Sequence, residues 1–304
     1  MHELSEDRFF AKLFGRLRVQ DNSLVIAPGD DCAAIRWHDD LLMLLAVDQV
    51  IGDRHYISSG SKASAPQLAG RKLLARNLSD IAAMGGKPRL CLLSMAFPPH
   101  RNQAWLQAFY DGIIECADQY QVAMIGGDLA KAPNDEVASL TIIGEVRENL
   151  VVQRNGAEAG DYLCMTGLCG DSFQSQHHLY FEPRCREGIW LANKQYAKAM
   201  IDISDGLLLD AWRICQASQC GLQLHLQKLP LRNSQRCLQK SISDGEDFEL
   251  LFAVSPEKLP ALQAEWQFTD TPITVIGRFT AVTTEIRDED NNLLRIEGWD
   301  HLRN

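Results

Sequence analysis

The aspartates of this 304-residue chain gather where apolar segments end or where glycines turn the chain. Seven positions share this character: Asp30, Asp31, Asp48, Asp80, Asp128, Asp202 and Asp205. Carboxylate oxygens collected from several elements are the ligands that hard divalent cations prefer, and Mg²⁺ in turn bridges phosphate oxygens. The pattern indicates metal-assisted chemistry on a phosphorylated substrate.

Each aspartate also has a plain structural interpretation. Asp30 could belong to a turn, Asp205 could cap the helix that follows it, and Asp80 could face solvent. Asp48 is different, because neither a turn nor a cap explains an acid inside the apolar run 41–50. Burying a carboxylate is costly unless a cation or several donors compensate it. Taken together, the aspartates favour a cation site.

Other catalytic signatures are missing from the sequence. It contains no G-x-x-x-x-G-K-[ST] phosphate loop, no G-x-G-x-x-G, no protein-kinase motif set, no G-x-S-x-G and no H-E-x-x-H. His177-His178 reads as a loop pair rather than a metal site. If ATP binds, we expect metal-bridged phosphates and backbone amides to hold it.

The elements that must position these residues follow from the apolar periodicity. In the first half we expect strands at 41–50, 91–97, 122–128 and 139–146 and helices at 71–84 and 102–120. We interpret this half as a β–α–β–β–α–β, ferredoxin-like arrangement. The polar stretch 147–161 suggests a boundary, which gives domains 1–147 and 148–304. In the second half we expect strands at 161–167, 199–206, 247–254 and 273–280 and a helix at 207–218.

Composition excludes several classes of protein. A formal net charge of −10 argues against a nucleic-acid-binding role, and no apolar run is long enough to span a bilayer. The first residues lack the apolar core of a signal peptide. The nine cysteines form no C-x-x-C pair, which disfavours zinc and disulfides and favours free thiols in a reducing cytoplasm.

The motifs resemble the thiamine-monophosphate kinase family, within the superfamily of aminoimidazole ribonucleotide synthetase and selenophosphate synthetase. The matching stretches run along nearly the whole chain: PGDDCA (28–33), VDQVIGDRHY (47–56), ARNLSDIAAMGGKP (75–88), IGGD (125–128), GDYLCMTGLCGDS (160–172), HLYFEPR (178–184), IDISDGLLLD (201–210), SDGEDFELLF (243–252) and GWDHL (298–302). NLSD-x-AAMG together with SDG and GEDFEL is specific, whereas GGD alone would be weak.

The resemblance implies a two-domain α/β (α+β) fold. Its ferredoxin-like N-terminal domain would form a β-barrel with a second copy, and a C-terminal α/β domain would complete the substrate site. It also implies direct transfer of the ATP γ-phosphoryl group to thiamine monophosphate, without a covalent nucleophile on the protein. ATP is then the co-substrate, several Mg²⁺ ions are the cofactors, and the partner is a second copy of the chain.

The resemblance further implies roles for individual residues. The implied Mg²⁺ ligands are Asp31, Asp48, Asp80, Asp128, Asp202 and Asp205. Contacts to ATP would come from Gly127, Asp128, Arg154 and Ser204. Contacts to the thiamine moiety would come from His55, Glu246 and Trp299, with the indole stacking on an aromatic ring.

The chain departs from the family pattern in three places. Ala46 and Val47 stand where the family carries two hydroxyl residues beside the aspartate, and Leu129 replaces the threonine after GGD. Only residues 173–177 separate two motifs that a helix normally joins. We therefore expect weaker metal dependence. Two alternatives stay open: another ATP-dependent reaction of the superfamily, and a nucleotide-binding regulatory protein with weakened catalysis.

Overall fold

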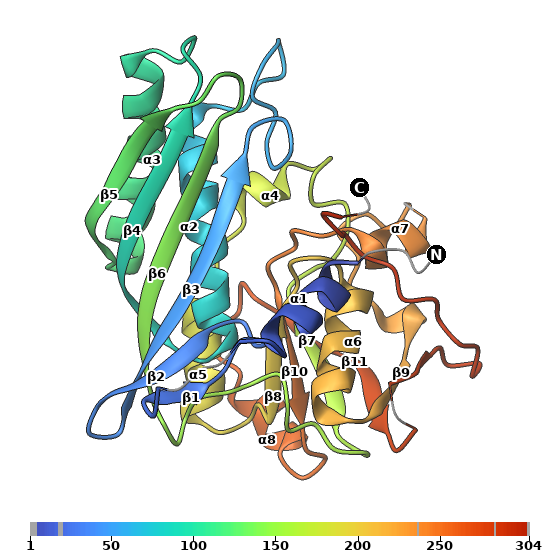
Figure 1. The fold of residues 1–304 in the computed structure, drawn as a ribbon. Helices are drawn as coiled ribbons and strands as arrows, with labels where there is room; N and C mark the ends of the chain where they lie inside the picture. The colour runs from blue at the N-terminus through green and yellow to red at the C-terminus, as the bar shows by residue number, and fades with distance from the viewer. Residues whose placement is uncertain (1–4, 18–20, 236, 283, 303–304) are drawn as a thin grey trace.

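The computed structural model describes residues 5–17, 21–235, 237–282 and 284–302. Two six-stranded sheets, each accompanied by helices, make up the fold (Figure 1). We call them sheet A, with the order β1-β2-β3-β6-β4-β5, and sheet B, with the order β12-β9-β11-β7-β10-β8. The mixed α/β class expected from the sequence is confirmed.

Sheet A comes from the first half of the chain and sheet B from the second. The strands of sheet A are β1 (Leu24–Ile26), β2 (Ala33–His38), β3 (Leu41–Ile51), β4 (Lys87–Phe97), β5 (Ala123–Lys131) and β6 (Val137–Arg147). Those of sheet B are β7 (Tyr162–Thr166), β8 (Ala199–Asp202), β9 (Gly221–Leu224), β10 (Leu250–Val254), β11 (Ile273–Thr280) and β12 (Ile286–Arg287). The α-helices are α1 (Glu6–Phe14), α2 (Pro66–Ala83), α3 (Gln103–Tyr120), α4 (His177–Tyr180), α5 (Cys185–Asn193), α6 (Leu207–Ser218), α7 (Leu238–Ser243) and α8 (Leu259–Glu265).

The expected β–α–β–β–α–β order of the first half is wrong. From β3 to β6 the order is β–α–β–α–β–β, because α3 lies between β4 and β5. These two strands are parallel neighbours, and a parallel pair needs a crossover connection, which α3 supplies. The other strand pairs of sheet A are antiparallel.

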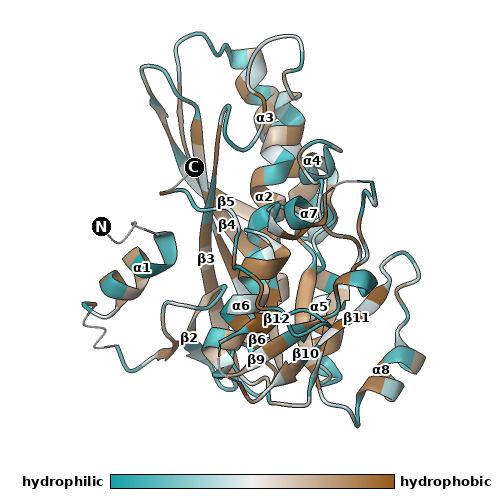
Figure 2. Cartoon of the chain, turned by 90° about the vertical axis from the view of Figure 1, so that its right-hand side faces the viewer, coloured by the Kyte–Doolittle hydropathy of each residue, from teal (hydrophilic) through white to brown (hydrophobic). Residues whose placement is uncertain are grey.

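Helices α2 and α3 cover one face of sheet A, which we call the inner face (Figures 1 and 2). In β3, Leu42 and Leu44 are buried toward these helices, and in β4 Leu93 and Met95 are buried in the same way. The residues between them face the opposite side, the outer face, because side chains alternate along a strand.

Helix α2 lies between the two halves of the molecule. It begins at Pro66, where a missing backbone N–H costs nothing, and most of its residues are buried. One buried apolar cluster contains Leu78 of α2, residues of sheet A, and Leu191 and Phe252 from the second half. The division into domains 1–147 and 148–304 stays a prediction, and this cluster crosses it.

No helix in the described part of the chain is both long enough and apolar enough to cross a membrane. This finding agrees with the absence of a long apolar run in the sequence.

A glycine pair controls how closely α2 and α3 pack, and it provides a test of the fold. A Cβ at Gly112 would lie 1.9 Å from the carbonyl oxygen of Gln67, and one at Gly70 would lie 1.9 Å from that of Phe109. Gly112→Ala adds about 1 kcal/mol of helix propensity. It also forces two backbones apart, which costs about 1–3 kcal/mol or more. We expect net destabilisation, measured as a lower urea midpoint.

Gly15→Ala is the control, because the nearest atom to its added Cβ would be 3.5 Å away and its φ is −61°. Its midpoint should stay close to that of the parent. A midpoint that rises in Gly112→Ala would show that the helices do not meet at this glycine.

Candidate active site

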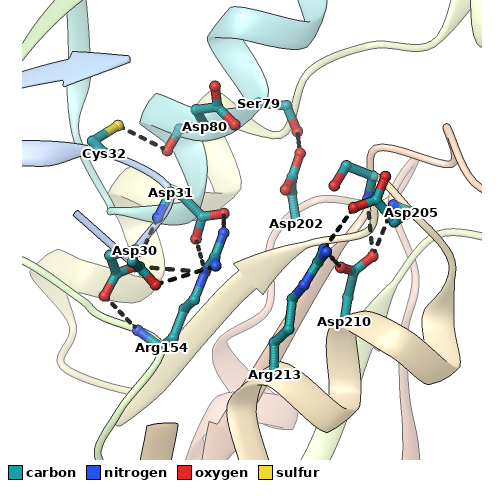
Figure 3. Close-up of polar contacts among 12 residues, drawn as sticks. Asp30, Asp31, Cys32, Ser79, Asp80, Arg154, Asp202, Asp205, Asp210 and Arg213 are labelled. Atoms are coloured by element: carbon teal, nitrogen blue, oxygen red, sulfur yellow. Dashed lines mark hydrogen bonds and ion pairs between the residues drawn. The ribbon is translucent and has the colours of Figure 1, made fainter. Parts of the chain in front are cut away.

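Three carboxylates from distant parts of the chain converge at one end of α2 (Figure 3). Asp31 precedes β2, Asp80 lies in the last turn of α2, and Asp202 ends β8. Their oxygens lie within 4.8 Å of one another, and we call this group the carboxylate cluster. Burial, together with the neighbouring carboxylates, raises the pKa of Asp80 and Asp202 well above the ordinary value.

Few donors compensate the charge of the carboxylate cluster. Ser79 Oγ donates to Asp202 Oδ2 at 2.5 Å, and Arg154 Nη2 donates to Asp31 Oδ1 at 2.7 Å. The backbone N–H of Arg154 also donates to Asp30. Burial and the nearby Asp31 raise the pKa of Asp30 to about 6. One guanidinium thus faces several acids. Buried oxygen ligands with excess negative charge are the donor set that Mg²⁺ requires, so these residues fit that ion.

The other three predicted metal ligands do not join the carboxylate cluster. Asp48 forms an ion pair with Arg76 of α2, and Asp205 forms one with Arg213 of α6 at 2.7 Å. Asp128 pairs with Ser94 in the register of β4 and β5, and Ser94 lies between two inward-facing residues of β4. Asp128 is therefore on the outer face of sheet A, and the sheet separates it from the cluster within one chain.

The predicted ATP contacts are also dispersed. Arg154 lies at the carboxylate cluster, while Ser204 follows the end of β8 and its backbone N–H donates to Asp210. Gly127 lies on the exposed strand β5 with Asp128. Sequence motifs alone gave no information about which face of the sheet these residues occupy.

The positions where the chain departs from the family pattern are also informative. Ala46 packs against the core, whereas Val47 is 67% exposed and points to the outer face. Val47 alternates with Asp48 along β3, so within one chain the two side chains lie on opposite faces of sheet A. Leu129 is exposed on β5.

A pocket of about 360 Å³ lies beside the carboxylate cluster and is lined by all three predicted thiamine contacts, His55, Glu246 and Trp299. Ser204 and Asp205 also line it. The remaining lining residues are Arg54, Arg76, Phe173, Gln174, Ser243, Asp244, Gly245 and His301. A larger cavity of about 620 Å³ beside α1 shares only Ser243 and Trp299 with this pocket and contains no predicted metal ligand.

The two copies of Ile-Ser-Asp-Gly, at 203–206 and 242–245, lie against each other at this pocket. A Cβ at Gly245 would come within 2.6 Å of the Ser204 carbonyl oxygen, and Gly206 has a φ of 125° that suits glycine. The backbone N–H of Glu246 donates to the Ser204 carbonyl at 2.8 Å. Glu246 itself has a φ of 65°, a left-handed conformation that is uncommon for a residue with a side chain.

His55 is neutral and has a defined tautomer. Its Nδ1 accepts the backbone N–H of Ile51 at 2.9 Å, so the ring proton is on Nε2. Burial and the nearby Arg76 lower the pKa of His55 to about 3. The ring can therefore act as a hydrogen-bond donor through Nε2.

Three residues that the sequence analysis did not assign complete the site. Lys72 is fully buried, and its Nζ contacts the Glu246 carboxylate at 2.7 Å, His178 Nδ1 at 2.8 Å and the carbonyl of His55. His178 belongs to α4 and is buried, so the interpretation of His177-His178 as a loop pair is wrong. Arg76 is the third residue. The spacing of Lys72, Arg76 and Asp80, four residues apart on one helix, was the signal that could have revealed Lys72 and Arg76.

Comparison with known proteins places this arrangement in a family. A family model described as "AIR synthase related protein, N-terminal domain" matches residues 29–146. The chain is 35% identical to the thiamine-monophosphate kinase of Rhodopirellula baltica, with 91% of this chain and 90% of the relative covered. It is 30% identical to that of Escherichia coli, with 98% of each covered. The structure of AaThiL complexed with AMPPCP and TMP covers 99% of this chain and 98% of its own, with a TM-score of 0.84 and 26% identity. The chain belongs to the thiamine-monophosphate kinase family.

Proposed function

We propose that this protein transfers the γ-phosphoryl group of ATP to thiamine monophosphate and forms thiamine diphosphate. The observation that carries the proposal is the position of the carboxylate cluster beside a pocket with an aromatic wall, the two being joined by one face of α2. The relative named as AaThiL was solved with AMPPCP and TMP, and it shares the fold over nearly its whole length.

The pocket suits a flat cationic ring that carries a phosphate. Trp299 and Phe173 offer aromatic faces, on which the thiazolium of thiamine can stack with a favourable cation–π interaction. Glu246, fixed by Lys72, places a negative charge near that cation. Nε2–H of His55 supplies a directed donor.

The reaction needs no general base from the protein. A phosphate monoester has a second pKa near 6, so its oxygen is already deprotonated at neutral pH. That oxygen forms a bond to the γ-phosphorus while the bond from this phosphorus to the bridging oxygen of ADP breaks. The protein binds both partners, aligns them and excludes water. Mg²⁺ held by Asp31, Asp80 and Asp202 would neutralise charge on the phosphate oxygens.

We also propose that the protein works in the cytoplasm. All nine cysteines are free thiols, and eight of them are buried, which supports a reducing compartment.

We further propose a homodimer in which sheet A of one chain meets sheet A of another and closes a barrel. The outer face of sheet A carries apolar side chains with no helix of the described chain packed on them: Met43, Leu45, Val47, Leu90, Leu92 and Ile143. Val47 is 67% exposed, which is costly for a side chain in the middle of a sheet. Gly127 and Asp128 would then face the partner.

The proposed reaction predicts a strict product balance. With ATP, Mg²⁺ and thiamine monophosphate, the protein should release ADP and thiamine diphosphate in equal amounts, measured by chromatography. Thiamine, which lacks the phosphate, should give no product. If ADP forms at the same rate without thiamine monophosphate, another reaction of the superfamily applies. If no ADP forms under any condition, the regulatory alternative applies.

The proposed metal site predicts that Asp80→Asn changes the melting temperature differently in the absence and in the presence of Mg²⁺. Asp80→Asn removes one of three repelling carboxylates, so the metal-free protein should melt about 2 °C higher, the scale of about 1 kcal/mol. The rise in Tm that Mg²⁺ causes in the parent should disappear. Asp118→Asn, on the exposed surface of α3, is the control and should keep that rise. An equal Mg²⁺-induced rise in Asp80→Asn would exclude the carboxylate cluster as the metal site.

The proposed dimer predicts a mass of about 68 kDa by light scattering, twice the chain mass of 34.0 kDa. Val47→Glu places a charge on the outer face and should give the monomer mass. Ile114→Glu changes another exposed apolar residue, on α3 at the other side of the sheet, and should leave the dimer intact. A parent that is monomeric, or a dimer unaffected by Val47→Glu, would contradict this interface.

A further inference from the structure

One stripe of α2 connects the pocket to the carboxylate cluster. Lys72, Arg76 and Asp80 are spaced four residues apart and therefore lie on one face, over about 12 Å of helix. Lys72 contacts Glu246 at the pocket, and Asp80 belongs to the carboxylate cluster. Arg76 lies between them. A phosphoryl group passing from metal-held ATP to a substrate in the pocket must cross this middle position.

Two nitrogens of the Arg76 guanidinium have partners in the protein, and the third, Nη2, has none among the described residues. Its Nε contacts Asp48, its Nη1 donates to the carbonyl of Gln49 at 2.9 Å, and its guanidinium lies 5.9 Å from the ring centre of Phe248. No hydrogen bond within the described residues uses Nη2. Every fully buried side-chain nitrogen and oxygen among those residues has a hydrogen-bond partner. Nη2 has none within this part of the chain, so it must be accessible to solvent. Arg76 also lines the pocket.

Binding a phosphate in this acidic pocket requires a cation such as Arg76. Asp205, Asp244 and Glu246 line it, and a phosphate dianion would be repelled by them. Lys72 cannot bind the phosphate, because its ammonium group is fully buried and already contacts three acceptors. Among the lining residues, the remaining permanent cations are Arg54, which is exposed, and Arg76, whose side chain is only 11% exposed.

We propose that Arg76 is a catalytic residue that binds the acceptor phosphate through Nη2, while Asp48 holds the guanidinium in position. This inference rests on the proposed function. The guanidinium fixes the oxygen that attacks the γ-phosphorus and neutralises charge as that bond forms and the bond to ADP breaks. Arg76 thus gives the site its selectivity for a phosphorylated substrate, and Asp48 acts through Arg76.

The experiment compares two ligands that differ only in the phosphate. Calorimetry measures the Kd of thiamine and of thiamine monophosphate for the parent and for Arg76→Met. Losing one charge-assisted contact should weaken thiamine monophosphate about 10- to 100-fold. Thiamine affinity should stay within about twofold, since it has no phosphate to lose. Arg76→Lys keeps the charge but not the fork geometry, and it should recover part of the preference.

Arg71→Met is the matched control. Arg71 lies on the same helix, is 16% exposed and pairs with Glu182, but it does not line the pocket. It should leave both Kd values unchanged. If Arg76→Met fails to fold because Asp48 loses its partner, the double variant Asp48→Asn/Arg76→Met removes both charges and takes the same measurement.

The outcomes are distinct. If thiamine monophosphate keeps its advantage over thiamine in the Arg76 variants, the inference is wrong. If Arg71→Met loses the advantage equally, the effect comes from helix packing and the inference is also wrong. If the parent forms no thiamine diphosphate, the proposed function fails instead. If the parent is active and only the Arg76 variants lose the advantage, the inference holds.

Discussion

Mutual repulsion among buried carboxylates is the constraint on which the rest of this structure depends. Asp31, Asp80 and Asp202 each place one carboxylate oxygen within 4.8 Å of the others, and the residues are buried or partly buried. Arg154 and Ser79 compensate only part of that charge. Such a group is stable only if a rigid framework holds it and a cation neutralises it. The cost of keeping these carboxylates together is the physical basis of the proposal that the site binds a metal ion and the phosphates attached to it.

Helix α2 is that framework. It is buried against sheet A on one side and against the second half on the other, so its ionised side chains have little freedom. Lys72, Arg76 and Asp80 each meet a different part of the site: the acid of the pocket, the carboxylate of β3 and the carboxylate cluster. In the proposed reaction, this helix face would fix the distance between the two substrates, and phosphoryl transfer depends mainly on such positioning.

The sequence predicted most of the elements and all three residues of the carboxylate cluster, together with three further aspartates that lie outside it. The strand at 273–280 and the helix at 207–218 match β11 and α6, because their apolar periodicity is strong. The face that a strand residue occupies could not be predicted. A register shift between Cys91 and Leu92 decides that Asp128 faces outward, and a bulge of this kind leaves no clear mark in one sequence. Asp48 was correctly singled out as an anomalous acid, but its partner Arg76 is distant along the chain and was not recognised.

The most direct test of this account is a crystal structure with a non-hydrolysable ATP analogue, Mg²⁺ and thiamine monophosphate bound together. We expect metal density on Asp31, Asp80 and Asp202, with the acceptor phosphate within about 3 Å of Arg76 Nη2. A phosphate bound elsewhere, for example at the exposed Arg54, with Arg76 contacting only Asp48 and Gln49, would contradict it.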